Sequence, residues 1–137
     1  MKKVYGLVLV IALLMVFLAA ERMAGSEASS LPSEDSKIVH AVFFWLKEGT
    51  SQEQKEKLIE DCNTLLRAVP SVRYVAAGPP VGAGGGAVDG SYGVGLVVHF
   101  DDEAGLEHYS KAPRHLEFIQ RHKSLWEKVQ VYDFQVK

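Results

Sequence analysis

The sequence predicts an α+β fold in which one antiparallel sheet carries two helices on a single face. Three observations lead to this prediction: an opening strand that is apolar on both faces, a helix that is apolar on one side only, and a second helical region that a proline interrupts. The predicted order is β-α-β-β-α-β, and such chains place both helices on one face of the sheet. The other face is left uncovered, so we expect a second copy to pack on it and form a homodimeric α+β barrel.

The opening strand is predicted over residues 37–46. Its side chains alternate between two apolar faces, so we expect a central strand that is covered on both sides. One face carries Ile38, His40, Val42, Phe44 and Leu46, and the other carries Val39, Ala41, Phe43 and Trp45.

The first helix follows a glycine and a capping signal. Two capping boxes are available at its start: Thr50 with Glu53, and Ser51 with Gln54. Apolar residues then recur at helical spacing, and Asp61 is among the residues expected to face solvent. The helix is predicted to end before Pro70, and a second strand is predicted over residues 72–78.

The second half of the domain also has the order strand, helix, strand, but a proline divides its helix in two. A third strand is predicted over residues 92–100, and Asp101 and Asp102 cap a helix over residues 103–111. Pro113 ends that helix and begins another, predicted over residues 113–121. Leu116 and Ile119 are expected to point inward from it. The last strand is predicted over residues 129–136, with Tyr132, Phe134 and Val136 on one face.

The connection between the second and third strands is rich in glycine from Gly78 to Gly90. A phosphate-binding glycine loop needs a helix directly after it, whereas a strand follows here. We therefore expect no nucleotide site. The stretch over residues 82–90 is predicted to be a mobile loop at the mouth of a cavity.

The residues before the domain differ in composition from the rest. Lys2 and Lys3 precede an almost unbroken apolar run over residues 4–20, which is the layout of a secretory signal peptide. The run also reaches the lower length limit of a membrane span, so residues 1–20 are predicted to be a cleaved signal peptide or a retained anchor. Residues 21–36 are small and polar and are predicted to be a flexible tether to the domain, residues 37–137. Both alternatives predict an exported protein, periplasmic or extracellular, that meets the membrane only through its N-terminal segment.

Length, charge and cysteine content limit the class of protein further. The 137 residues carry a formal net charge of -2, which suits one domain without a clustered basic surface, so no nucleic-acid partner is expected. Cys62 is the only cysteine, so no intramolecular disulfide can form. Its place on the apolar side of a helix favours a small buried hydrophobe over a reactive thiol.

Several short motifs, taken together, resemble a known family. They are His40 in the opening strand, Lys47 and Gly49 before the capped helix, Pro70-Ser71-Val72, Val98-His99-Phe100-Asp101-Asp102, Tyr109 with Pro113-Arg114-His115, Leu125-Trp126-Glu127-Lys128, and Val131-Tyr132-Asp133-Phe134. Over residues 37–137 the chain resembles the stress-responsive α/β-barrel (Dabb) domain family. It is distantly similar to dimeric α+β barrel proteins of the olivetolic acid cyclase type. The resemblance implies a ferredoxin-like monomer that pairs into a barrel dimer.

The resemblance also implies a site. Tyr109 and His115 match the positions of a cofactor-free acid-base pair, and His40 matches a histidine that lines the same pocket. This chain departs from the family pattern at Ala112 and Val94, where relatives carry histidine. The predicted catalytic residues are therefore Tyr109 and His115. The predicted ligand-contact residues are His40, Val42, Phe44, Val94 and Leu116.

Residue chemistry supports the same pair, and the alternative is that His115 caps or orients the helical bend while Tyr109 packs with its hydroxyl at the surface. Near neutral pH an imidazole accepts a proton, and a phenol donates a hydrogen bond to a carbonyl that is becoming an enolate. His108, His115 and His122 are spaced by seven, but each step along a helix is about 10 Å, too far to share one ion. No metal and no cofactor are predicted.

Three classes of function remain open at this point. The first is a non-catalytic module that binds a small apolar or phenolic molecule between sheet and helices. The second is a cofactor-free lyase, cyclase or isomerase that uses the Tyr-His pair. The third is a purely structural, stress-associated dimer.

Overall fold

The computed structural model describes residues 35–82 and 84–137, and it confirms the predicted order of elements. The predicted leader, and all but the last two residues of the predicted tether, lie outside the described residues. In the described part, no helix is both long enough and apolar enough to cross a membrane. The elements are β1 (Ile38–Leu46), α2 (Gln52–Asp61), the π-helical turn η1 (Cys62–Leu66), β2 (Tyr74–Gly78), β3 (Val94–Phe100), α3 (Glu103–Lys111), α4 (Pro113–His122), the 3-10 turn η2 (Lys123–Leu125) and β4 (Trp126–Gln135).

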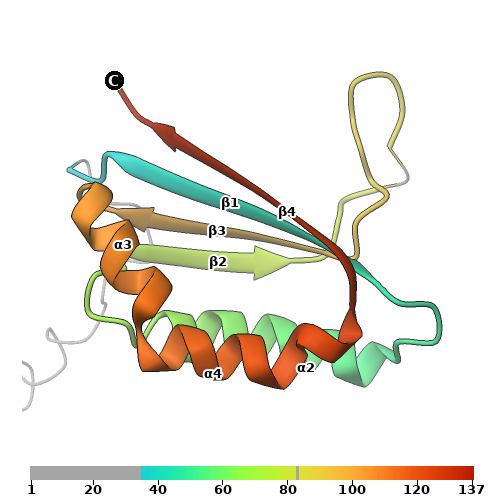
Figure 1. Ribbon diagram of the computed structural model, residues 1–137. Coiled ribbons are helices and arrows are strands. Elements are labelled where there is room, and N and C mark those ends of the chain that lie inside the picture. Colours follow the sequence, from blue (N-terminus) through green and yellow to red (C-terminus); the bar gives the residue numbers. More distant parts are fainter. Residues whose placement is uncertain (1–34, 83) are drawn as a thin grey trace, which may run out of the picture. The chain divides into compact units, whose positions relative to one another are not determined.

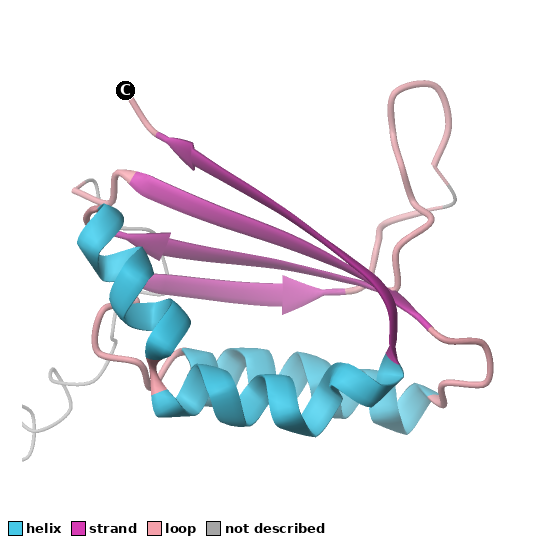
Figure 2. Ribbon diagram, in the orientation of Figure 1, coloured by secondary structure: helices cyan, strands magenta, loops and turns pink. Residues whose placement is uncertain are grey.

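The four strands form one antiparallel sheet in the order β2-β3-β1-β4. β1 is central, as its two apolar faces predict, and β2 and β4 are the edges. Figures 1 and 2 show α2 and α4 running side by side along one face of the sheet, with α3 at one end. The register places His40 of β1 opposite Val98 of β3 on one side and Asp133 of β4 on the other.

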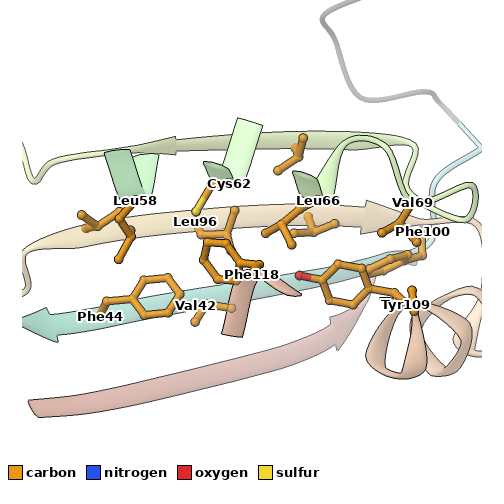
Figure 3. Close-up of a cluster of buried hydrophobic side chains, with 14 of the residues drawn as sticks. Val42, Phe44, Leu58, Cys62, Leu66, Val69, Leu96, Phe100, Tyr109 and Phe118 are labelled. Atoms are coloured by element: carbon orange, nitrogen blue, oxygen red, sulfur yellow. The ribbon is translucent and has the colours of Figure 1, made fainter. Parts of the chain in front are cut away.

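The core lies between this face and the helices (Figure 3). Leu58, Cys62 and Leu66 from α2 and η1 are fully buried. They pack with Phe118 of α4 against the helix-facing side chains of β1 and β3. Cys62 is thus the buried hydrophobe that the sequence predicts, and burial raises the pKa of its thiol to about 12. Truncating such a residue, for example Leu58→Ala, typically costs about 2–5 kcal/mol of unfolding free energy.

Both helix starts follow the predicted capping chemistry. Ser51 accepts a hydrogen bond from the Gln54 backbone N–H while the Gln54 side chain accepts one from the Ser51 backbone N–H, so the second of the two available boxes is the one formed. Asp102 alone caps α3, by accepting from Gly105 N–H at 2.8 Å. These caps satisfy backbone donors that the first turn of each helix leaves unpaired.

The structure corrects several details of the sequence prediction. β2 and β3 each begin two residues later than predicted, and β4 begins earlier, at Trp126. Leu116 does not point inward and is 49% exposed. The inward stripe of α4 runs through His115, Phe118, Ile119 and His122 at helical spacing, and Leu116 falls outside it.

Asp61 is also corrected, because it is buried where solvent exposure is predicted. One of its carboxylate oxygens accepts from His122 Nε2 at 2.9 Å and from Arg121 at 3.2 Å, while Lys57 binds the other at 3.0 Å. Burial alone would raise the pKa of Asp61, but these hydrogen bonds hold it below its usual value. The carboxylate therefore ties α2 to the end of α4.

The second face of the sheet is apolar and open. We call it the open face and define it by Phe43, Trp45, Tyr92, Tyr132 and Phe134. The Phe43 ring lies between Tyr92, at a centroid distance of 4.9 Å, and Tyr132, at 6.3 Å. No described element covers these rings, and Tyr132 and Phe134 remain 57% and 55% exposed.

We expect Asp61→Asn to lower the unfolding free energy by about 1–3 kcal/mol, because the buried hydrogen-bonding set around His122 loses its charged acceptor. Since the folded-state pKa of Asp61 is depressed, its contribution is present above pH 3.8 and is lost as the pH falls through the lower folded value. Urea unfolding from pH 7 to pH 3 measures both effects. The control Glu60→Gln removes an exposed partner of Lys57 and should change stability little. Equal losses in the two variants would contradict this role of Asp61.

Candidate functional site

A cavity of about 250 Å³ lies between the helix-facing side of the sheet and helices α3 and α4. Most of its wall is aliphatic or aromatic, and its polar groups come from two histidines, one tyrosine and one serine. The wall is formed by His40, Val42, Phe44, Leu96, Leu106, Tyr109, Ser110, His115, Phe118, Ile119, Trp126, Val129 and Val131.

The bend between α3 and α4 brings the two predicted catalytic residues together. Ala112 adopts extended geometry before Pro113, so α3 ends and α4 begins in a new direction. Tyr109 lies near the end of α3, and His115 lies in the first turn of α4. Their ring centroids are 4.3 Å apart.

His115 is held in a defined orientation. Its Nδ1 lies 3.1 Å from the carbonyl oxygen of Ser110, which can only accept, so Nδ1 carries the proton and donates. Nε2 of the neutral ring is then left as an acceptor. Burial lowers the pKa of His115 below its usual 6.5, opposed by the hydrogen bond to Ser110 and reinforced by nearby His40. His115 is therefore a neutral hydrogen-bond acceptor at pH 7.

Tyr109 is a buried phenol whose hydroxyl forms no hydrogen bond with another described residue. Its side chain is 2% exposed, and burial raises its pKa above the usual 10, so the hydroxyl stays protonated at neutral pH. Figure 3 shows the oxygen pointing back along the sheet toward Phe118, another residue of the cavity wall. Tyr109 thus supplies a hydrogen-bond donor on a ring that packs against the ring of His115.

His40 is positioned by a residue that the sequence reasoning missed. Its Nδ1 lies 2.6 Å from a carboxylate oxygen of Asp133, its cross-strand partner on β4. A carboxylate next to one ring nitrogen fixes the tautomer and orientation of the imidazole. The His40 ring lies 5.7 Å from that of Tyr109, so the three rings form a continuous row. The alternation of β4 places Asp133 on the same face as Val129 and Val131, but only the register identifies its partner.

The other predicted contact residues divide into two groups. Val42 and Phe44 line the cavity beside His40. Val94 and Leu116 do not line it, because Val94 is fully buried in the core and Leu116 faces away from the sheet. Ala112, where relatives carry histidine, is buried next to the bend. The loop over residues 82–90 was predicted at the cavity mouth, but none of its described residues belongs to the wall.

A ferredoxin-like sheet with a small, mostly apolar cavity under its helices defines the class of this protein. The chain belongs to the Stress responsive A/B Barrel Domain family, whose profile matches residues 38–136. A comparison with curated protein sequences gave no match.

Solved structures share the fold at low sequence identity. A dimeric ferredoxin-like protein of unknown function from Thermobifida fusca is 22% identical, with a TM-score of 0.64, covering 77% of this chain and 96% of that one. The hydroxynitrile lyase of Passiflora edulis is 24% identical, with a TM-score of 0.65 and coverage of 75% and 95%. A Dabb family protein from Mesorhizobium loti is 24% identical, with a TM-score of 0.60 and coverage of 72% and 95%.

We expect His115 to titrate below pH 6.5, because burial disfavours its charged form. The unfolded chain then binds protons more readily than the folded one, so the unfolding free energy decreases as the pH falls from 6.5 toward the folded pKa. Nitrogen-proton correlation spectra of the imidazoles measure the titration directly. In urea unfolding experiments, the unfolding free energy of His115→Gln should depend less steeply on pH in this window. A titration midpoint of His115 at or above 6.5 would contradict the assignment.

Proposed function

We propose that this domain binds a small, mostly apolar molecule that carries a phenolic hydroxyl, in the cavity between sheet and helices. One observation carries the proposal: the cavity wall is mostly apolar, and three of its polar side chains, His40, Tyr109 and His115, form one row of rings. An apolar cavity of about 150 Å³ holds benzene. A cavity of about 250 Å³ therefore suits one ring with a short alkyl substituent.

The polar groups favour a neutral ligand that both donates and accepts. A ligand hydroxyl can donate to Nε2 of His115, and the same oxygen can accept from the Tyr109 hydroxyl. Both protein groups are uncharged at pH 7, so neither pairs with a ligand charge. The aliphatic wall supplies the larger part of the affinity, since burial of apolar surface contributes about 25 cal/mol per Å².

The alternative is a cofactor-free lyase, cyclase or isomerase at the same site. The contact between Tyr109 and His115 favours it, because the rings that carry an acceptor nitrogen and a phenolic donor pack together at a centroid distance of 4.3 Å. His115 Nε2 would take a proton from a hydroxyl or from a carbon beside a carbonyl, and Tyr109 would donate to the oxygen that gains charge. The likeness to a hydroxynitrile lyase is in the fold, and it suggests hydroxynitriles as one substrate class to test.

We also propose that the protein is an exported homodimer. The exposed aromatic rings of the open face support the dimer, as do the ferredoxin-like neighbours described as dimeric. The apolar run at residues 4–20 after two lysines supports export, with the N-terminal segment either cleaved or kept as an anchor. A structural dimer that binds nothing is the remaining alternative, and ligand titration distinguishes it.

Filling the cavity should weaken ligand binding. Val131 lines the cavity and is 40% exposed, so Val131→Phe can fill it without straining the core. With Trp45→Phe in every variant, Trp126 of the wall is the only tryptophan, and its fluorescence reports occupancy. We expect Val131→Phe to raise the Kd for short alkylphenols at least about tenfold. Val136→Phe, at a 49% exposed position outside the wall, is the matched control and should bind normally. No response from any phenol in the parent would favour the structural alternative.

Removing the tyrosine hydroxyl tests the polar contact. We expect Tyr109→Phe to weaken an alkylphenol about threefold to tenfold, the effect of one hydrogen bond, and to leave the corresponding alkylbenzene unaffected. If hydroxynitriles, phenols or polyketide-like acids are turned over, Tyr109→Phe and His115→Ala should each abolish turnover. The rate should fall as the pH drops through the His115 pKa, below 6.5. Turnover that survives both substitutions would reject the catalytic alternative.

A further inference from the structure

The connection between β2 and β3 forms an arm that stands away from the helices. We call residues 79–82 and 84–92 the β2–β3 arm. Figure 1 shows it rising from the end of the sheet on the side opposite to α2 and α4. The cavity wall contains no described residue of the arm, so a role in the ligand site does not account for it.

The base of the arm is fixed to the open face. The Trp45 indole Nε1 donates to Ser91 Oγ at 2.9 Å, and Tyr92 packs on Phe43. The Ser91 backbone N–H donates to Asp89 Oδ1 at 2.8 Å. Further out, Gly85 and Val88 exchange two backbone hydrogen bonds of 2.9 and 3.0 Å. The arm thus ends in a hydrogen-bonded turn, and its root belongs to the same surface as the exposed aromatic rings.

The arm presents apolar side chains to solvent. Val81 is 94% exposed and Val88 is 63% exposed, the two highest values among the large hydrophobic side chains of the described chain. Asp89 is the only charged side chain among the described arm residues, and its carboxylate is engaged by Ser91. The two valines form an apolar contact surface that no other described residue covers.

The length of the arm indicates what it meets in a dimer. Two facing sheets pack about 10 Å apart, whereas each leg of the arm has about seven residues and spans up to about 20 Å when extended. If the open faces of two copies pack together, an arm rooted at that interface is too long to end between the sheets. It must continue past the partner's sheet along its edge. The arm is therefore continuous with the proposed dimer interface and extends it.

We propose that the β2–β3 arm is a dimer clasp, which grips the second copy of this chain through Val81 and Val88. This inference rests on the homodimer proposed above. Two-fold symmetry gives each dimer two arms, so every arm contact occurs twice. A substitution that removes one contact therefore removes two from the dimer. The occupant is a second copy because the root of the arm, Ser91 and Tyr92, is built into the face that the copies share.

The test is the dimer dissociation constant of the full-length chain. Sedimentation equilibrium in density-matched detergent, at one detergent concentration throughout, compares the parent with Val81→Asp/Val88→Asp. We expect the dissociation constant to rise at least about tenfold, with unchanged far-ultraviolet circular dichroism. Ala104→Glu/Gln120→Glu adds the same charge at exposed positions of α3 and α4 and is the matched control, expected to dimerise like the parent.

The outcomes separate the two proposals. A parent chain that is monomeric at micromolar concentration overturns the homodimer, and the clasp with it. A dimeric parent whose arm variant keeps the same dissociation constant overturns the clasp alone. If the circular dichroism of the aspartate variant is altered, Val81→Ser/Val88→Ser takes its place. The serine variant removes the apolar contact without adding charge, and it should also weaken the dimer. An unchanged constant in that variant also overturns the clasp.

Discussion

The two apolar faces of β1 are the constraint on which the rest of the structure depends. A strand of this kind is stable only when both faces are covered and both edges are paired. β3 and β4 pair with its edges, and α2 with α4 covers one face. The remaining face keeps its exposed rings and is the surface proposed for the second copy. The monomer architecture and the proposed dimer therefore both follow from the same nine residues.

The cavity exists because the helices leave part of β4 uncovered. Val129 and Val131 lie on the helix-facing side of the sheet, yet they are 37% and 40% exposed. Pro113 turns the chain at that place, so the space is bounded by the ends of two helices instead of the side of one. Tyr109 and His115 lie on either side of the bend, and their rings are in contact there. The Asp61 carboxylate holds the other end of α4 against α2, which keeps the wall in place.

Local signals in the sequence predict most of the fold, whereas the site depends on pairings between distant residues. Ser51, Asp102 and Pro113 mark element boundaries through chemistry that acts within a few residues, so these boundaries are predictable. The contact between His40 and Asp133 joins residues 93 positions apart and requires the strand register. Likewise, the helical pattern alone predicts that Asp61 is exposed, and only the packing of α4 beside α2 shows that it is buried. The pattern also predicts that Leu116 points inward, because the sequence does not show which side of α4 faces the sheet.

The position of β4 has a consequence for proteolysis. This strand comes last among the described elements. It supplies Val129 and Val131 to the cavity wall, Asp133 to the contact with His40, and Tyr132 and Phe134 to the open face. A cleavage in the η2 turn that released β4 would therefore remove a wall of the pocket, the carboxylate that orients His40, and part of the open face at once. The proposed ligand site and the proposed dimer surface would be lost together, and the shortened fragment would expose the edge of β1 with which β4 otherwise pairs.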